Sequence, residues 1–138
     1  MHPILAPVVG LVLWTFVIWT WMYATRLPAM ARMRMKSDPR APRGQQMSEL
    51  PAEVRWKADN YNHLMEMPTL FYAVALVIAV TGVDQPLDTM LAWGYVGLRV
   101  GHSFVQALGN KVEVRFVVFA LSSLVLGALA LRAAWLVF

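Results

Sequence analysis

The stretch ILAPVVGLVLWTFVIWTWMYAT, residues 4–25, contains no charged side chain. A helix rises about 1.5 Å per residue, so these 22 residues can cross the hydrocarbon core of a bilayer, which is about 30 Å thick. A cleaved signal peptide has a basic start and a shorter apolar core, so we interpret this segment as a retained helix. Aromatic side chains gather near its end, before Arg26, as is typical of a membrane interface. The sequence therefore predicts a first transmembrane helix.

The composition of the whole chain also indicates a membrane protein. Hydrophobic residues make up 59% of the 138 residues and charged residues only 14%, which is too little polar surface for a soluble globule. The chain has no cysteine, so disulfides and thiolate metal sites are excluded, and any thiol chemistry has to come from a bound small molecule. The net charge is +4, but the basic residues gather in one loop, so no nucleic-acid partner is expected.

Three further segments have a similar apolar character. The chain is predicted to be an all-α membrane protein, a bundle of four transmembrane helices in a single domain of residues 1–138. The helices are expected over residues 4–25, 52–83, 89–109 and 114–138. A basic loop over about residues 26–51 joins the first two helices, and its four prolines interrupt regular structure.

Most of the basic residues lie in one part of the chain, between the first predicted helix and the start of the second. Residues 26–58 hold eight of the twelve, namely Arg26, Arg32, Arg34, Lys36, Arg40, Arg43, Arg55 and Lys57. Because Lys and Arg favour the cytoplasmic side of a membrane, this loop and the turn at Lys111 are predicted to be inside. The turn with Asp84 and Asp88, and both termini, are predicted to be outside. The expected location is a bacterial inner membrane, crossed several times, with both termini in the periplasm.

Polar side chains form a stripe on each of the second and third helices. The stripe on the second helix contains Arg55, Asp59, His63 and Glu66 at spacings of four, four and three, with Asn62 beside them. The stripe on the third helix contains Arg99, His102 and Gln106. A charge at bilayer depth costs about 2.5 to 3.5 kcal/mol on insertion scales, so these side chains need partners. We therefore expect the two stripes to meet.

Arg115, at the start of the fourth helix, is expected to join the stripes in the cytoplasmic half of the membrane. The shared cavity would then carry an excess of positive charge, which suits an anionic ligand held by guanidinium groups. Other interpretations remain open. Glu66 and Arg99 can form an ion pair that only fixes helix packing. The basic side chains near the membrane edge, Arg55, Lys57 and Arg115, can contact lipid headgroups. His63 and His102 can ligate haem, although the pattern predicts no metal site.

The motif on the second helix resembles that of the MAPEG family, the membrane-associated proteins in eicosanoid and glutathione metabolism. It reads Arg55-xxx-Asp59-Asn60-xx-His63-xx-Glu66-x-Pro68, followed by Leu70-Phe71-Tyr72, and the resemblance continues at Arg99-xx-His102 and at Arg115. The resemblance implies a homotrimer that binds glutathione between subunits near the cytoplasmic side. It also implies a lipophilic electrophile or peroxide as the second substrate.

The resemblance further implies roles for individual residues. Arg55 and Arg99 would hold the carboxylates of glutathione, Glu66 its ammonium group, and Arg115 would be the catalytic residue that stabilises the thiolate. The other expected ligand-binding residues are Asn62, His63, His102 and Gln106. His63 stands where the family usually has an asparagine, and Gln106 where glutathione-conjugating members often have a tyrosine.

Two functions are therefore predicted as alternatives. The first is a glutathione-dependent transferase or peroxidase, with glutathione as co-substrate and membrane lipid, a lipophilic small molecule and further copies of the chain as partners. The second is a non-catalytic membrane module that binds a lipid, a quinone or a protein complex, in which the polar stripes only hold the bundle together.

Overall fold

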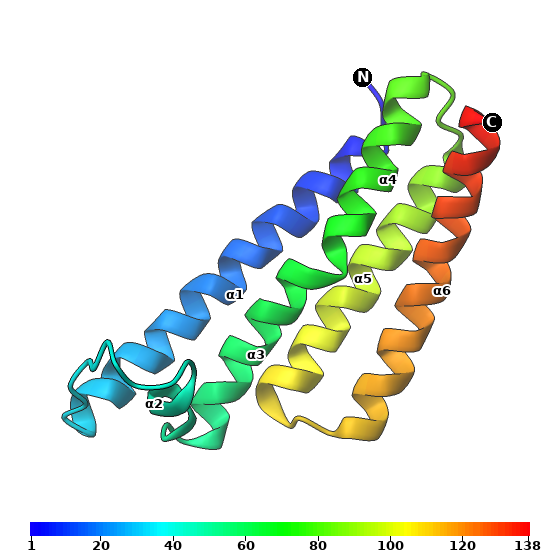
Figure 1. Cartoon of the computed structure of the whole chain (residues 1–138). Coiled ribbons are helices and arrows are strands. Elements are labelled where there is room, and N and C mark those ends of the chain that lie inside the picture. Colours follow the sequence, from blue (N-terminus) through cyan, green and yellow to red (C-terminus); the bar gives the residue numbers. More distant parts are fainter.

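The computed structural model describes all 138 residues and contains helices but no strands. Four long columns run side by side, one of them made of two helices in succession (Figure 1). The helices are α1 (Leu5–Arg32), α2 (Gln45–Ser48), α3 (Ala52–Glu66), α4 (Pro68–Thr81), α5 (Pro86–Leu108) and α6 (Val112–Val137).

Three of these columns are long and apolar enough to cross a membrane: α1, the column from Ala52 to Thr81, and α6. Many of their large apolar side chains are exposed on the surface of the chain, among them Phe16, Leu124 and Trp135. Such a surface favours contact with lipid. The fourth column, α5, has 23 residues but is less apolar, because it carries Asp88 and Arg99 as well as other polar side chains.

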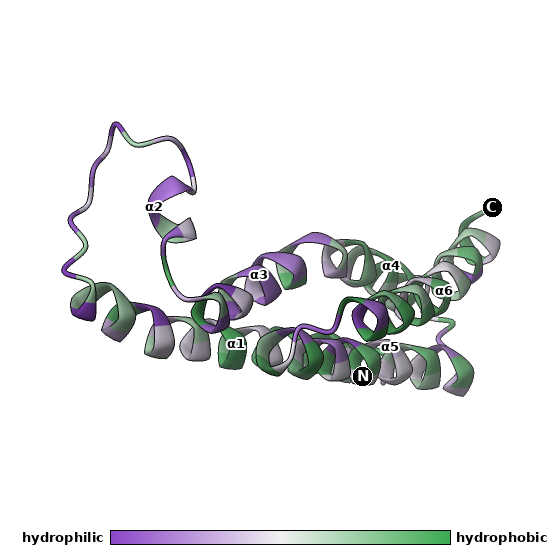
Figure 2. Cartoon of the chain, turned by 90° about the horizontal axis from the view of Figure 1, so that it is seen from below, coloured by the Kyte–Doolittle hydropathy of each residue, from purple (hydrophilic) through white to green (hydrophobic).

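The two ends of the bundle differ in character. Both termini lie at one end, beside the connection between α4 and α5 (Figure 1). The segment that contains α2 lies at the other end, together with the connection between α5 and α6. Figure 2 shows that the chain around α2 is mainly hydrophilic, whereas most of α4 and α6 is hydrophobic. The chain therefore has a basic end and an opposite end that holds both termini.

Helix α5 organises the packing, because it contacts α1, α3 and α6, while α4 contacts α1 and α6. The buried core joins apolar side chains of all the long columns, for example Leu11 of α1, Ile78 of α4 and Leu129 of α6. Phe71 and Tyr95 stack with their ring centroids 4.6 Å apart, which fixes α4 against α5.

Helix α1 is longer than the sequence predicts, because it continues past residue 25 to Arg32. The apolar run marks only the part that matches the thickness of the bilayer, and a helix can continue beyond it. Pro28 lies inside this extension and removes a single backbone hydrogen bond. The positive side chain of Arg32 lies in the last turn, where it interacts favourably with the negative end of the helix dipole.

The single helix predicted over residues 52–83 is divided at Met67 into α3 and α4. Pro68 is the first residue of α4 and has no N–H to donate to the carbonyl group of the preceding turn, so the hydrogen-bond ladder is interrupted there. Met67 keeps helical dihedral angles, φ −60° and ψ −38°, so the chain passes from α3 to α4 without a loop. Gly82, with φ 72°, ends α4 in the left-handed conformation that glycine adopts readily.

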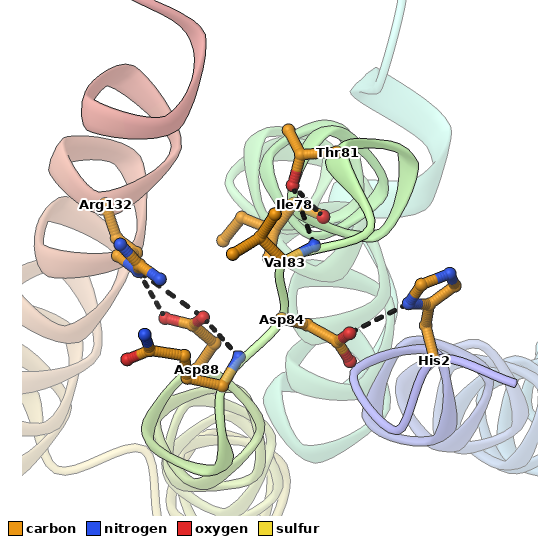
Figure 3. Close-up of polar contacts among 8 residues, drawn as sticks. His2, Ile78, Thr81, Val83, Asp84, Asp88 and Arg132 are labelled. Atoms are coloured by element: carbon orange, nitrogen blue, oxygen red, sulfur yellow. Dashed lines mark hydrogen bonds and ion pairs between the residues drawn. The ribbon is translucent and has the colours of Figure 1, made fainter.

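An ion pair and a side-chain hydrogen bond hold the end of the bundle where the termini lie (Figure 3). Asp88 of α5 is only 1% exposed, and its two carboxylate oxygens lie 3.2 and 3.4 Å from Nε of Arg132 on α6. The same carboxylate accepts the backbone N–H of Gln85 at 2.9 Å and so caps α5. At the start of the chain, His2 Nδ1 lies 2.8 Å from an oxygen of Asp84.

The contact with His2 predicts a pH dependence of stability. The hydrogen bond from His2 lowers the pKa of Asp84 below its ordinary value of 3.8. A carboxyl group whose pKa is lowered by folding stabilises the fold above its unfolded pKa, and this contribution is lost as the pH falls through the folded value. We therefore expect the Tm of the wild-type protein in detergent to fall more steeply below about pH 4 than that of Asp84→Asn.

The matched control for this measurement is Glu113→Gln, which removes an exposed carboxylate that has no hydrogen-bond partner in α6. It should keep the steep acid-side fall of the wild type. Parallel Tm curves for Asp84→Asn and the wild type would show that the contact between His2 and Asp84 does not contribute to stability.

Candidate functional site

The polar stripe of α5 faces the interior of the bundle. Arg99, His102 and Gln106 are 1%, 2% and 3% exposed. The guanidinium group of Arg99 has no hydrogen-bond partner on any of its three nitrogens. A buried charge without a partner is costly, so this group favours the approach of an anion or of ordered water.

The expected ion pair between Arg99 and Glu66 does not form within one chain. The side chain of Glu66 is 71% exposed, and its contact is with His63, whose Nδ1 lies 3.8 Å from a carboxylate oxygen. Glu66 therefore points away from α5, and its carboxylate is free to meet a ligand or another chain.

The two stripes meet at His63 and His102. Their rings face one another with centroids 4.7 Å apart and planes tilted by 31°. His102 Nε2 lies 3.1 Å from the amide oxygen of Gln106. With this oxygen as acceptor, Nε2 carries the proton, and Nδ1 of His102 is left as a buried acceptor without a partner. Gln106 thus orients the imidazole ring by a hydrogen bond.

Arg115 joins these two histidines in a cavity of about 250 Å³ at the basic end of the bundle. The cavity is lined by His63, His102, Val112, Arg115, Phe116 and Phe119. Nη1 of Arg115 donates a hydrogen bond to the side-chain oxygen of Asn110 at 2.5 Å, while its Nε is buried without a partner. The cavity therefore offers a guanidinium group and imidazole rings beside an apolar wall, which suits an anionic atom next to a lipophilic group.

Arg55 and Asn62 lie in a separate pocket of about 410 Å³ on another face of α3. Its lining also includes Asp59 of α3, Arg26 from α1 and Arg43 from the basic loop. The three arginines come from three different parts of the chain, and they outnumber the single carboxylate. Arg26 and Arg43 were not predicted as site residues. Their only signal in the sequence is membership of the basic loop, which does not say which pocket a side chain lines.

Two further polar residues of α3 have environments that the sequence did not predict. Asn60 is fully buried, and neither its amide nitrogen nor its amide oxygen has a partner. Lys57 is also buried, donates to the carbonyl group of Glu53 at 2.8 Å and lies 5.4 Å from the ring centroid of Trp21. Lys57 therefore packs against α1 through a cation–π contact and is not a free headgroup contact.

The long apolar columns, with their exposed apolar side chains, define a multi-pass membrane protein built as a helical bundle. The family model of the MAPEG family matches residues 4–135, which is nearly the whole chain. The chain belongs to the MAPEG family, so the family predicted from the motifs is confirmed. Searches of curated proteins and of solved structures found no match.

Proposed function

We propose that the chain is a glutathione-dependent transferase or peroxidase that acts on lipophilic substrates. The observation that carries this proposal is the cavity in which Arg115, without a carboxylate partner, lies beside His63 and His102. Lowering a thiol pKa from about 8.5 to about 7 takes roughly 2 kcal/mol, which one charge-assisted hydrogen bond can supply. Arg115 is the residue that supplies it.

The polar groups of the chain fit glutathione, which has two carboxylates, one ammonium group and one thiol. Arg55 lines one cationic pocket with Asn62, and Arg115 lines the other. Arg99 adds an unpaired positive charge between α3 and α5, where it attracts a carboxylate. The exposed carboxylate of Glu66 is available for the ammonium group. The chain has no cysteine of its own, so the reacting thiol comes from the ligand.

The two cationic pockets support a homotrimer with its sites between subunits. They open on different faces of α3, so one glutathione molecule cannot readily contact both within a single chain. Where the pocket of one subunit meets the cavity of the next, the same ligand can contact both. An interface of this kind completes the predicted set of ligand-binding residues.

The placement in the membrane is part of the proposal. We place all four columns across a bacterial inner membrane, with the basic end in the cytoplasm and both termini in the periplasm. Helix α5 can cross the bilayer despite its charges, because Arg99 is buried and Asp88 is paired with Arg132, so neither faces lipid. The glutathione site then opens toward the cytoplasm.

The chemistry is nucleophilic attack by the thiolate sulfur of glutathione. With an electrophile, a carbon–sulfur bond forms and the leaving group departs with its bonding electrons. With a lipid peroxide, the sulfur is oxidised to a sulfenic acid and the peroxide is reduced to an alcohol, and a second glutathione then gives the disulfide and water. In both cases the thiol proton leaves before attack, and the chain stabilises the sulfur anion.

Calorimetric titration of the purified protein with glutathione tests this proposal. We expect saturable binding at millimolar concentrations or below, weakened by Arg55→Gln and unchanged by Arg40→Gln, a basic-loop variant outside both pockets. S-methylglutathione should also bind, but it cannot react with a chromogenic electrophile. No saturable binding at millimolar glutathione would overturn the proposal and favour the non-catalytic membrane module.

A further inference from the structure

Asn110 lies in the short connection between α5 and α6, beside the cavity of Arg115. Its φ of 48° is in the left-handed region. Residues other than glycine rarely adopt this region, and asparagine is among those that tolerate it best. Its backbone N–H donates to the carbonyl oxygen of Val105 at 2.7 Å and so ends α5. The backbone of this residue is therefore held in one conformation by the turn.

The side chain of Asn110 makes a second contact of a different kind. Its oxygen accepts the hydrogen bond from Nη1 of Arg115 at 2.5 Å, and this is the one hydrogen bond that the Arg115 side chain makes within the chain. Arg115 forms no ion pair with a carboxylate. A carboxylate at this distance would cancel much of the positive charge, whereas an amide oxygen orients the guanidinium group and leaves its charge in place.

We propose that Asn110 is a positioning residue, whose side-chain oxygen holds the Arg115 guanidinium at the cavity with its charge free to stabilise a thiolate. This inference rests on the proposed function, because it assigns Asn110 a role in the same site. The position of the residue supports it. A connection of residues 109–111 fixes the distance between the end of α5 and the first turn of α6, which carries Arg115.

Two substitutions separate the side-chain role from the backbone role. Asn110→Gly removes the acceptor but keeps, and relaxes, the left-handed backbone, so the turn should form at least as well. Asn110→Asp keeps an acceptor and tolerates the same backbone, but it adds a negative charge next to the guanidinium group. A purely structural turn residue would leave the thiol chemistry unchanged in Asn110→Gly, whereas Asn110→Asp tests whether a charge at this side chain is felt by the bound thiol.

The experiment is a pH titration of the thiolate absorbance of bound glutathione, with the spectrum of the S-methylglutathione complex subtracted. The chain has no cysteine, so the thiolate signal belongs to the ligand. We expect a thiol pKa well below 8.5 in the wild-type complex. Asn110→Gly and Asn110→Asp should each raise it by on the order of one unit, with about tenfold lower kcat/KM at neutral pH. The Kd for glutathione should change little, since other residues hold its carboxylates.

The outcomes of this titration separate the two proposals. An unchanged thiol pKa in Asn110→Gly, with the fold intact, overturns the positioning role while the proposed function stands. Should Asn110→Gly fail to fold, an unchanged thiol pKa in Asn110→Asp overturns the positioning role in the same way. A wild-type complex with an ordinary thiol pKa, or no complex, overturns the proposed function and the positioning role together.

Discussion

Replacing Arg115 with alanine is expected to lower kcat/KM for glutathione conjugation at neutral pH by roughly 10- to 30-fold, because a stabilisation of about 2 kcal/mol changes the thiolate population by that factor. The guanidinium group lines the cavity together with His63 and His102, and no other arginine or lysine lines it. Without Arg115 the bound thiol keeps an ordinary pKa and is mostly protonated at neutral pH. The measurement is steady-state turnover of a chromogenic electrophile at saturating glutathione, together with glutathione binding by calorimetry.

Two variants make this result interpretable. Lys111→Ala removes a basic side chain only four positions away, which is exposed and lies outside the cavity, so it should keep full activity. Arg115→Lys keeps a positive charge but not the planar fork of donors, so it should retain only part of the rate. Activity of Arg115→Ala within a few-fold of the wild type would remove Arg115 from the catalytic role.

Replacing Arg132 with methionine is expected to destabilise the fold by about 3 to 5 kcal/mol, the usual cost of removing one partner of a buried ion pair. Asp88 is almost fully buried, and Arg132 is the only side chain paired with its carboxylate. Arg132 itself is partly exposed, which places the expected cost near the lower end of that range. The measurement is thermal or chemical unfolding of the protein in detergent.

A double-mutant cycle with Asp88→Asn separates the ion pair from the helix cap. The asparagine side chain can still accept the backbone N–H of Gln85, so the cap of α5 is kept while the negative charge is removed. Asp88→Asn combined with Arg132→Met should therefore recover much of the stability that Arg132→Met loses. Additive losses in the double variant would show that the two side chains do not stabilise one another.

The helical architecture was largely predictable, because long apolar runs leave few alternatives. An uncharged stretch marks α1, a long and mainly apolar stretch marks α6, and the turn around Gly82 marks the end of α4. The division at Met67 was not predicted, although Pro68 lies in the family motif. The chain becomes much more hydrophobic from α3 to α4, but a continuous helix that enters the bilayer shows the same change, so hydropathy does not reveal an interrupted hydrogen-bond ladder. The extension of α1 to Arg32 was missed because the apolar run ends at residue 25, while the helix continues beyond the thickness of the bilayer.

The site was predictable as a set of residues on one helix face, but not as a geometry. Each residue advances by about 100° around a helix, so Glu66 lies within about 20° of Arg55, while His63 lies about 80° from it. Residues spread over about 80° of the helix surface have sequence spacings of three and four, so the spacing alone places them on one face. In the structure only the His63 edge contacts α5, and the edge with Arg55 and Glu66 faces outward. The width of the stripe therefore explains why Glu66 and Arg99 do not meet.

Contacts between distant parts of the chain were the least predictable. Nothing in the sequence pairs Arg132 with Asp88, since the two are separated by 44 positions, Asp88 is expected in the turn before the third helix, and Arg132 looks like an isolated charge in the fourth. Asn110 gave no signal either, because its role depends on a left-handed φ and on the first turn of the following helix. Such partners become visible only when the packing of α5 against α6 is known.

The location of both termini at the end remote from the arginine-lined pockets has a practical consequence. An affinity tag or a fluorescent protein fused to either terminus would extend away from the cavity and leave its opening unobstructed. Nanodiscs captured on a sensor through such a tag would present the cavity to the flowing solution, so glutathione analogues can be screened on immobilised protein without moving the tag.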